Sequence, residues 1–332
     1  MDLERNRDMM KNRHNIVSGC KSFYLLAFPF LILTMFAVSS FAVPLESGPK
    51  VFSSSDEVLQ NLVIAVQAKD HAALKALFGP VARELEPVDP VDQSVEFEHF
   101  ARRVAEGVEL VKDGDEKAHL VIGAKKWHFP VPIVKKNGNW HFDTEAGREE
   151  ILTRRIGHNE LHAIKTSRAY VEAQREYYAM AEPDGEQVPK YAQRMISAPG
   201  HRDGLYWQTK PGEKESPLGP LVAKAKEEGY MQIRKEGGNG TRPFHGYYFK
   251  ILKRQGKHAP GGKYNYIINS NMVAGFALVA YPANWGSSGV MTFIVNQRGR
   301  VYQKNLGPKT AEIARKIRSF NPDLSWKLAT EQ

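Results

Sequence analysis

The spacing of apolar residues changes several times along this chain of 332 residues and indicates where helices and strands lie. Residues 53–56 supply N-cap chemistry, and Val58, Leu62, Ala65 and Val66 then recur on one face of a helix. A shorter helical segment follows and stops at Gly79 and Pro80. The first part of the chain is therefore expected to be helical.

From residue 108 the apolar period becomes two, which is typical of strands. Residues 108–111 and 118–122 flank Asp113-Gly114, and residues 131–134 and 140–142 flank Asn137-Gly138. These dipeptides accept the positive φ angles of tight hairpin turns. The pattern therefore predicts an antiparallel meander after the first helices.

Residues 146–178 return to helical spacing and predict a long helix that joins two domains. Strands are expected after it at 247–252, 264–268, 276–281, 290–295 and 301–304. A closing helix is expected from Thr310, with Ile313, Ile317 and Phe320 on one face. Together these elements predict an α+β fold with a linker at 43–50 and domains at 51–150 and 151–328.

The first 42 residues predict an export signal. Five basic residues precede an apolar run at 23–42, which ends in Ser40-Phe41-Ala42, a small-x-small site with cleavage after Ala42. The run is also long enough, at ~20 residues, for an N-terminal anchor. Cleavage is favoured because Pro29 interrupts the helix. We expect a periplasmic or secreted protein that touches a membrane only through this segment, if it stays uncleaved.

The distribution of charge and the cysteine content limit the classes of partner and of chemistry that the chain is expected to have. The net charge is +9, but the basic residues are spread along the chain rather than gathered into a stripe, so we expect no nucleic-acid partner. Cys20 is the only cysteine and precedes the apolar run, which excludes a lipid-modified cysteine. A mature chain would have no disulfide and no cysteine nucleophile. We expect a cell-envelope protein or polymer as partner.

Two histidines on the long helix resemble a metal-ligand pair. His158 and His162 lie four residues apart, so their side chains point the same way. The sequence shows no third ligand, and a zinc-protease pattern would place a glutamate directly after the first histidine. We therefore expect a surface histidine pair, with no metal site and no cofactor.

Aromatic residues in turns are the candidate binding residues. Tyr206 and Trp207 follow Arg202 and Asp203, and Trp285 lies in a loop between two strong strands. Loops on a rigid sheet are where binding residues collect, and aromatic rings suit sugars or partner proteins. The alternative is that these rings close the ends of a small sheet.

An enzymatic alternative places a site in the first domain. His128, His141 and Asp143 could supply a base and the carboxylate that orients it, as in a hydrolase or isomerase. Strand alternation puts His141 on the face opposite Trp140 and Phe142, so the proposal loses its base if those two rings fill the core.

Three resemblances accompany these patterns. The helices followed by the hairpin at 132–143 resemble the cystatin-like (nuclear transport factor two-like) fold. Asn159-Glu160, Ala173-Gln174 and the strands at 246–249, 275–282 and 289–301 resemble type IV pilin-like domains, although here the long helix begins behind another domain. Residues 51–328 resemble a bacterial family known as domain of unknown function number 2950, most specifically at 143–152, 202–207 and 275–307.

The resemblances imply folds but carry no activity. The hypothesis from the sequence is an exported, non-catalytic binding or interaction protein, because no catalytic motif is recognisable and both folds often serve as binding scaffolds. The alternatives are the enzyme with its site in the first domain and, from the pilin-like half, a component of a secretion apparatus.

Overall fold

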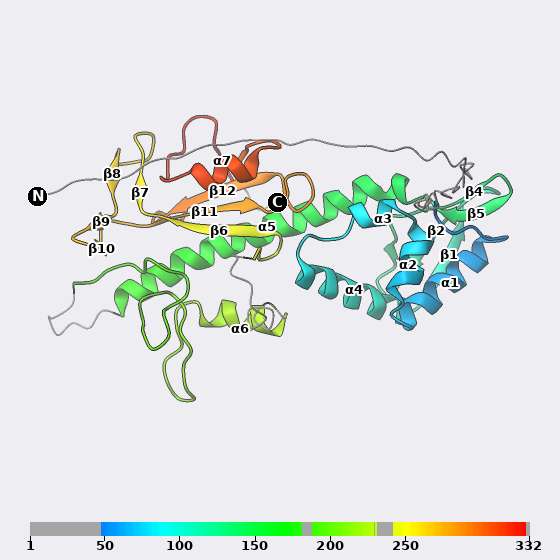
Figure 1. Cartoon of the computed structure of the whole chain (residues 1–332), viewed down its shortest axis with the longest axis horizontal. Helices are drawn as coiled ribbons and strands as arrows, with labels where there is room; N and C mark the ends of the chain where they lie inside the picture. Colours follow the sequence, from blue (N-terminus) through cyan, green and yellow to red (C-terminus); the bar gives the residue numbers. More distant parts are fainter. Residues whose placement is uncertain (1–47, 181–187, 229, 231–241, 330–332) are drawn as a thin grey trace, which may run out of the picture. The chain divides into compact units, whose positions relative to one another are not determined.

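A computed structural model describes residues 48–180, 188–228, 230 and 242–329 (Figure 1). The predicted signal at 1–42 lies outside the described residues, as does most of the predicted linker. Residues Glu46–Gln332 form one compact unit. Within the described part of the chain, helices combine with antiparallel sheets, which confirms the α+β fold class.

The first half contains helices that precede a sheet. The helices are α1 (Ser55–Gln67), α2 (His71–Phe78), α3 (Val81–Glu84) and α4 (Pro90–Ala105), and the strands are β1 (Val108–Lys112), β2 (Lys117–Ile122), β3 (Trp127–His128), β4 (Ile133–Lys136) and β5 (Asn139–Phe142). The sheet order is β1-β2-β4-β5, with β3 paired to β2. Its core includes Leu62, Leu120, Ile133 and Phe142, all fully buried.

Two local features of this half, a helix cap and a hairpin turn, agree with the sequence prediction. Ser54 caps α1 by accepting a hydrogen bond from the Glu57 amide. Asn137 and Gly138 have φ angles of 54° and 82° between β4 and β5, which confirms the tight hairpin turn. The sequence prediction lacks α4, whose buried residues are only Val91 and Val104.

The second half is organised around α5 (Thr144–Ala179), a helix of 36 residues. Asp143 caps it by accepting a hydrogen bond from the Ala146 amide, and its bounds agree with the predicted long helix. The other helices described are α6 (Gly219–Glu227) and α7 (Thr310–Lys316). No helix of the described residues is both long and apolar enough to cross a membrane.

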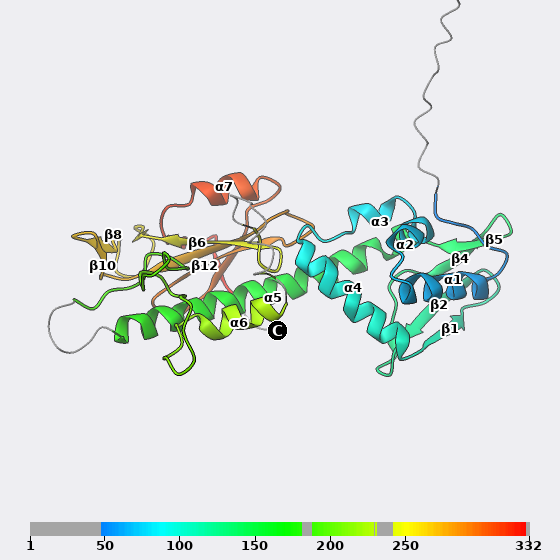
Figure 2. The ribbon, with the colours of Figure 1, turned by 60° about the horizontal axis from the view of Figure 1, so that its bottom comes forward.

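A second antiparallel sheet packs against α5. Its order is β14 (Lys327–Leu328), β13 (Tyr302–Asn305), β12 (Met291–Asn296), β11 (Ala277–Pro282) and β6 (Tyr247–Leu252). Figures 1 and 2 show the sheet between α5 and α7, in agreement with the contacts of α5 with β12 and β11 and of α7 with β11. Fully buried residues such as Tyr170, Phe276 and Phe293 fill the core. Each half of the described chain therefore has its own sheet and core cluster, while the domain boundary at residue 150 falls inside α5 and stays a prediction.

Two details of the second half correct the sequence prediction. The expected strand at 264–268 is interrupted: β8 (Tyr264–Asn265) pairs with β7 (Arg254–Gln255), whereas β9 (Ile267–Ile268) pairs with β10 (Asn271–Met272). The closing helix ends at Lys316. Ile313 is 40% exposed and Phe320 is buried beyond the helix, so these residues do not share one helical face.

Candidate metal centre

Helix α5 carries His158 and His162 at a spacing that places both rings on one face. The residues between them hold the helix in place. Asn159 donates a side-chain hydrogen bond to the Ser288 carbonyl (3.0 Å), and Glu160 accepts from the Val290 and Met291 amides at 2.9 Å each. The Asn159-Glu160 pair therefore anchors α5 to the sheet and fixes the direction of the two histidines.

A third histidine comes from the turn that leads into β6. Phe244 and Tyr247 exchange two backbone hydrogen bonds, and the turn residues His245 and Gly246 have φ angles of 45° and 69°. Histidine adopts positive φ angles more readily than most non-glycine residues. The conformation of these two residues therefore makes the tight turn that carries His245.

Gly246 explains why this turn reaches α5. A Cβ at position 246 would lie 2.6 Å from Asn159 Nδ2 and 2.9 Å from Ser288 Cβ, closer than real Cβ contacts allow. Only glycine permits this approach of the turn to the helix. Because His245 precedes Gly246 and His158 precedes Asn159, the close contact brings the two histidines together.

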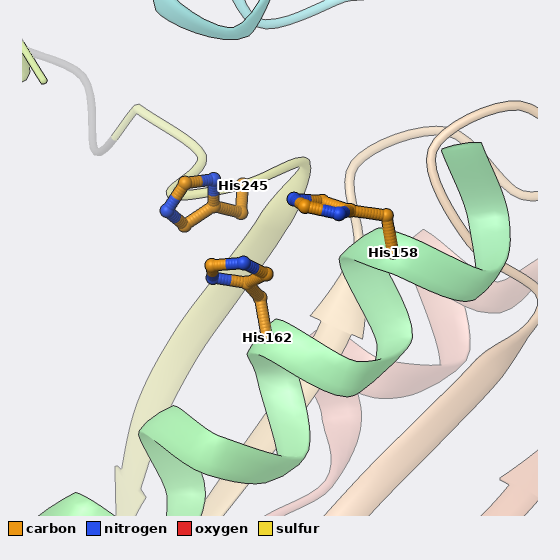
Figure 3. A group of neighbouring side chains, drawn as sticks. All are labelled: His158, His162 and His245. Carbon is orange, nitrogen blue, oxygen red and sulfur yellow. The ribbon is translucent and has the colours of Figure 1, made fainter. Parts of the chain in front are cut away.

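The three rings form a cluster (Figure 3). One ring nitrogen of each histidine lies within 4.8 Å of the others. The His162 ring is the middle one, because its centroid is 4.0 Å from that of His245 and 4.5 Å from that of His158, whereas His158 and His245 are 6.4 Å apart. The structure thus supplies the third histidine that the sequence did not show, so the expected surface pair is a cluster of three.

Carboxylates surround His245. Asp92 lies on α4, and its Oδ1 atom is 3.1 Å from the Nδ1 atom of His245. Tyr230 donates its hydroxyl hydrogen to the same Asp92 oxygen (2.7 Å) and accepts the His245 backbone N–H (3.0 Å). Desolvation and the nearby Asp92 charge raise the pKa of Tyr230, so its hydroxyl stays a donor. The Asp92 carboxylate therefore orients the His245 ring.

Glu228 presents a carboxylate oxygen at the other nitrogen of His245. Its Oε2 lies 3.1 Å from His245 Nε2, but the two atoms are not aligned as a hydrogen bond, and this buried oxygen has no hydrogen-bond partner among the described residues. The contact is an ion pair when His245 is protonated, so His245 lies between the carboxylates of Asp92 and Glu228.

Two of the three rings, those of His158 and His162, favour the neutral form. Burial lowers the pKa of His162 to about 4, with further contributions from the positive charge on His245 and His158. Burial also lowers the pKa of His158, and His245 adds to that effect. Neutral imidazole is the form that binds metal ions.

The residues fit a borderline transition-metal ion. Imidazole nitrogen is a preferred ligand for zinc, copper and nickel, and three histidines leave a tetrahedral ion one further position. Metal–nitrogen bonds of about 2.0–2.1 Å place ligand nitrogens about 3.4 Å apart in a tetrahedral site. Because the nitrogens now lie within 4.8 Å of one another, metal binding requires the rings to turn inward.

The structure brings most of the candidate binding residues together at a separate cavity of ≈ 480 Å³, whose lining includes Arg202, Tyr206 and Trp207. The Arg202 guanidinium lies 5.5 Å from the centre of a Trp207 ring. Asp203 instead holds its own loop, since it accepts from the Ala198 amide and pairs with Arg194 at 3.1 Å. Trp285 lies in the loop between β11 and β12 and bonds Asn305. Ligand binding by these residues stays a prediction.

The residues of the enzymatic alternative have other surroundings. Trp140 and Phe142 belong to the first core cluster, so strand alternation puts His141 on the opposite face of β5. Asp143 caps α5. His128 is exposed and lies beside His119, with ring centroids 5.5 Å apart. His141 is half-buried, and the enzymatic alternative stays a prediction.

Sequence reasoning found His158 and His162 but missed His245, Asp92, Tyr230 and Glu228. The available indication was His245-Gly246 directly before a strong strand, a pair that suits a tight turn with positive φ angles. Nothing in the spacing shows which helix that turn approaches, because the contact depends on tertiary packing.

Comparison with known proteins identifies the family. No curated protein and no solved structure matches the chain. A family model described as a protein of unknown function, DUF2950, matches residues 49–329. This match spans most of the chain and includes the three histidines and their carboxylate neighbours, and the protein therefore belongs to the DUF2950 family.

Proposed function

We propose that the protein is an exported, non-catalytic binding protein that holds one divalent transition-metal ion through His158, His162 and His245. The observation that carries the proposal is the convergence of three ring nitrogens within 4.8 Å from two elements far apart in the sequence. Zinc, nickel and copper are the ions that such ligands suit.

The surroundings of the three histidines support metal binding. The lowered pKa values of His158 and His162 keep their rings uncharged near neutrality. Asp92 holds the Nδ1 atom of His245, and Glu228 Oε2 is a buried oxygen without a hydrogen-bond partner among the described residues.

The location and partner follow from the leader sequence. Basic residues before an apolar run and a small-x-small site after it support export to the periplasm or the outside of the cell. A metal-binding chain there would act on a cell-envelope protein or polymer, with the cavity at Arg202, Tyr206 and Trp207 as the surface that contacts it. Fractionation of cells that produce the protein tests the location, and a cytosolic product with its leader intact would contradict it.

Calorimetric titration of the full-length chain with Zn²⁺, Ni²⁺ and Cu²⁺ tests metal binding. The wild type should bind one ion per chain. The variant His245→Asn should lose this binding, because asparagine accepts the positive φ angle but lacks the imidazole. Its matched control is His128→Asn, which removes an exposed histidine outside the cluster and should bind as the wild type does. A wild type that binds none of the three ions contradicts the proposal, and so does unchanged binding by His245→Asn.

A further inference from the structure

A further cavity, of ≈ 670 Å³, lies in the first half of the described chain, where the end of α4, the turn from β2 to β3 and helix α5 come together. Five lysine and arginine side chains from these elements line it: Arg102, Arg103, Lys125, Lys126 and Arg154. Glu106 is the one acidic residue among the described residues of the lining. Cavities of a few hundred cubic ångströms typically hold small organic molecules. The charge of this lining favours an anion.

Two of the five basic side chains are paired with carboxylates that lie outside the lining. Lys126 Nζ is 2.7 Å from Glu109 Oε2, and Arg154 Nε is 2.7 Å from Glu150 Oε1. All four of these side chains are exposed. Exposed ion pairs contribute little free energy, so Lys126 and Arg154 can still contact a ligand.

The other three basic side chains form no ion pair among the described residues: Arg102, Arg103 and Lys125. Glu98 lies near Arg102, but its carboxylate is paired with Lys69 at 2.6 Å. Glu106 accepts a hydrogen bond from the Ala124 amide (3.0 Å) and holds the turn after β2. With the histidines neutral, three unpaired positive charges and one negative charge leave the cavity with a positive excess. A phosphomonoester, which carries about −1.5 to −2 near neutral pH, matches this excess.

Trp127 holds two guanidinium groups at the cavity. The Cζ atoms of Arg103 and Arg154 lie 5.1 and 5.6 Å from the centre of its ring. Phe100 and Phe129 pack edge-on against the same ring, with centroids 6.5 and 5.8 Å away, and fix its position. Cation–π contacts thus hold guanidinium groups from two helices around one ring. A guanidinium held in this way loses less freedom when its planar fork binds phosphate oxygens.

A structural role alone does not account for this cluster of charges. Arg102 and Arg103 lie in the last turn of α4, where the helix dipole favours positive charge. Lys125 lies in a turn and Arg154 lies in the interior of α5, so the dipole does not explain them. Like charges gathered at one cavity repel one another, and a bound anion relieves the repulsion.

We propose that this cavity binds a phosphomonoester of about the size of a sugar phosphate, with Arg103 and Arg154 donating hydrogen bonds to the phosphate oxygens. Arg102 and Lys125 supply further positive charge. The inference concerns a site outside the histidine cluster and does not depend on the proposed metal binding. Soluble sugar phosphates and lipid headgroups both carry this group, and the experiment distinguishes the two sources.

Calorimetric titration of the full-length chain with glucose 6-phosphate tests the inference. The protein is first treated with chelator and dialysed, so that no metal ion at the three histidines binds the phosphate. The wild type should bind glucose 6-phosphate near neutral pH. Glucose 6-sulfate, which has one negative charge fewer, should bind about tenfold more weakly, and uncharged glucose should not bind.

Arginine variants identify the cavity as the site. Arg103→Gln and Arg154→Gln should each weaken binding about tenfold, because each removes one charge-assisted contact. Arg103→Lys keeps the charge but lacks the planar fork, so its affinity should be intermediate. The matched control is Arg175→Gln, because Arg175 also lies on α5 and pairs with Glu172 at 2.7 Å, outside the cavity. The control should bind as the wild type does.

Vesicles test the lipid source. The wild type and Arg103→Gln are sedimented with phosphatidylcholine vesicles, with and without phosphatidate. The apolar run at 23–42 is common to both chains, so a difference between them reports the cavity. Binding that requires phosphatidate and that Arg103→Gln loses assigns the phosphate to a lipid headgroup. Binding of glucose 6-phosphate alone assigns it to a soluble molecule.

Four results would overturn the inference. The wild type binds neither probe, both glutamine variants bind glucose 6-phosphate as tightly as the wild type, or glucose 6-sulfate binds as tightly as the phosphate. The fourth is an oligothymidylate without terminal phosphates that binds more tightly than glucose 6-phosphate, because it would assign the cavity to a nucleic-acid backbone.

Discussion

The contact between Asp92 and His245 offers the sharpest test of the metal centre, because it connects α4 of the first half to the turn before β6. Asp92 Oδ1 lies 3.1 Å from His245 Nδ1 and accepts the Tyr230 hydroxyl hydrogen at 2.7 Å. Replacing Asp92 with alanine leaves all three histidines in the chain but removes the group that orients one of them. The variant therefore tests the carboxylate's role without deleting a ligand.

The expected magnitude follows from the role of such carboxylates. Loss of a partner that orients a metal-binding histidine typically lowers metal affinity about 10–100-fold, which is about 1.4–2.7 kcal/mol. Both proteins are compared at one metal concentration, well above both dissociation constants. The gain in free energy of unfolding on metal binding should then be about 1.4–2.7 kcal/mol smaller for Asp92→Ala than for the wild type. For a chain of this size, the metal-induced rise in Tm should shrink by about 2–5 °C.

The assay is thermal unfolding of the wild type and the variant, each with Zn²⁺ and with chelator. The difference between the two conditions isolates metal binding from any loss of stability caused by the substitution itself. Asp113→Ala is the matched control, because Asp113 also pairs with a histidine (His119, 2.8 Å) but lies outside the cluster. Equal metal-induced shifts in the wild type and Asp92→Ala would refute the assigned role of Asp92.

Further predictions concern the histidines and the interior of the second half. His162 is the middle ring of the three, so His162→Ala should weaken Zn²⁺ binding more than His158→Ala does, as measured by calorimetry. Because the pKa of His162 is lowered to about 4, the unfolded chain binds more protons than the folded chain between that pH and its ordinary value of 6.5. Urea unfolding of the metal-free protein should therefore show lower stability at pH 5.5 than at pH 7.5, and His162→Gln should reduce this difference; an unchanged difference would contradict the lowered pKa. Gln174 is fully buried and hydrogen-bonds both the N–H and the C=O of Ala192. Gln174→Ala should therefore lower the free energy of unfolding by about 2–4 kcal/mol. The control Glu172→Ala, at an exposed position of the same helix, should change it by less than about 0.5 kcal/mol.

Some elements could be predicted from the sequence because their causes are local. The hairpin at Asn137-Gly138 follows from two residues that accept positive φ angles, and α1 follows from a cap and an apolar face. Helix α6 buries only Ala225 and shows no clear apolar stripe. Helix α4 was missed although its signals are local, since Asp89 caps it, Pro90 begins it, and Phe97, Phe100, Ala101 and Val104 recur at helical spacing.

The sequence by itself determined the α+β class, the long helix and the common direction of His158 and His162, because these depend on residues within a few positions of one another. Only the tertiary structure decided that His245, Asp92 and Glu228 lie beside that pair, since they come from separate segments. Gly246 permits the turn to contact α5, a property that matters only once the sheet has packed on the helix. The local spacing of residues determines on which face of a helix or strand a side chain lies. Tertiary packing determines which other side chains it contacts.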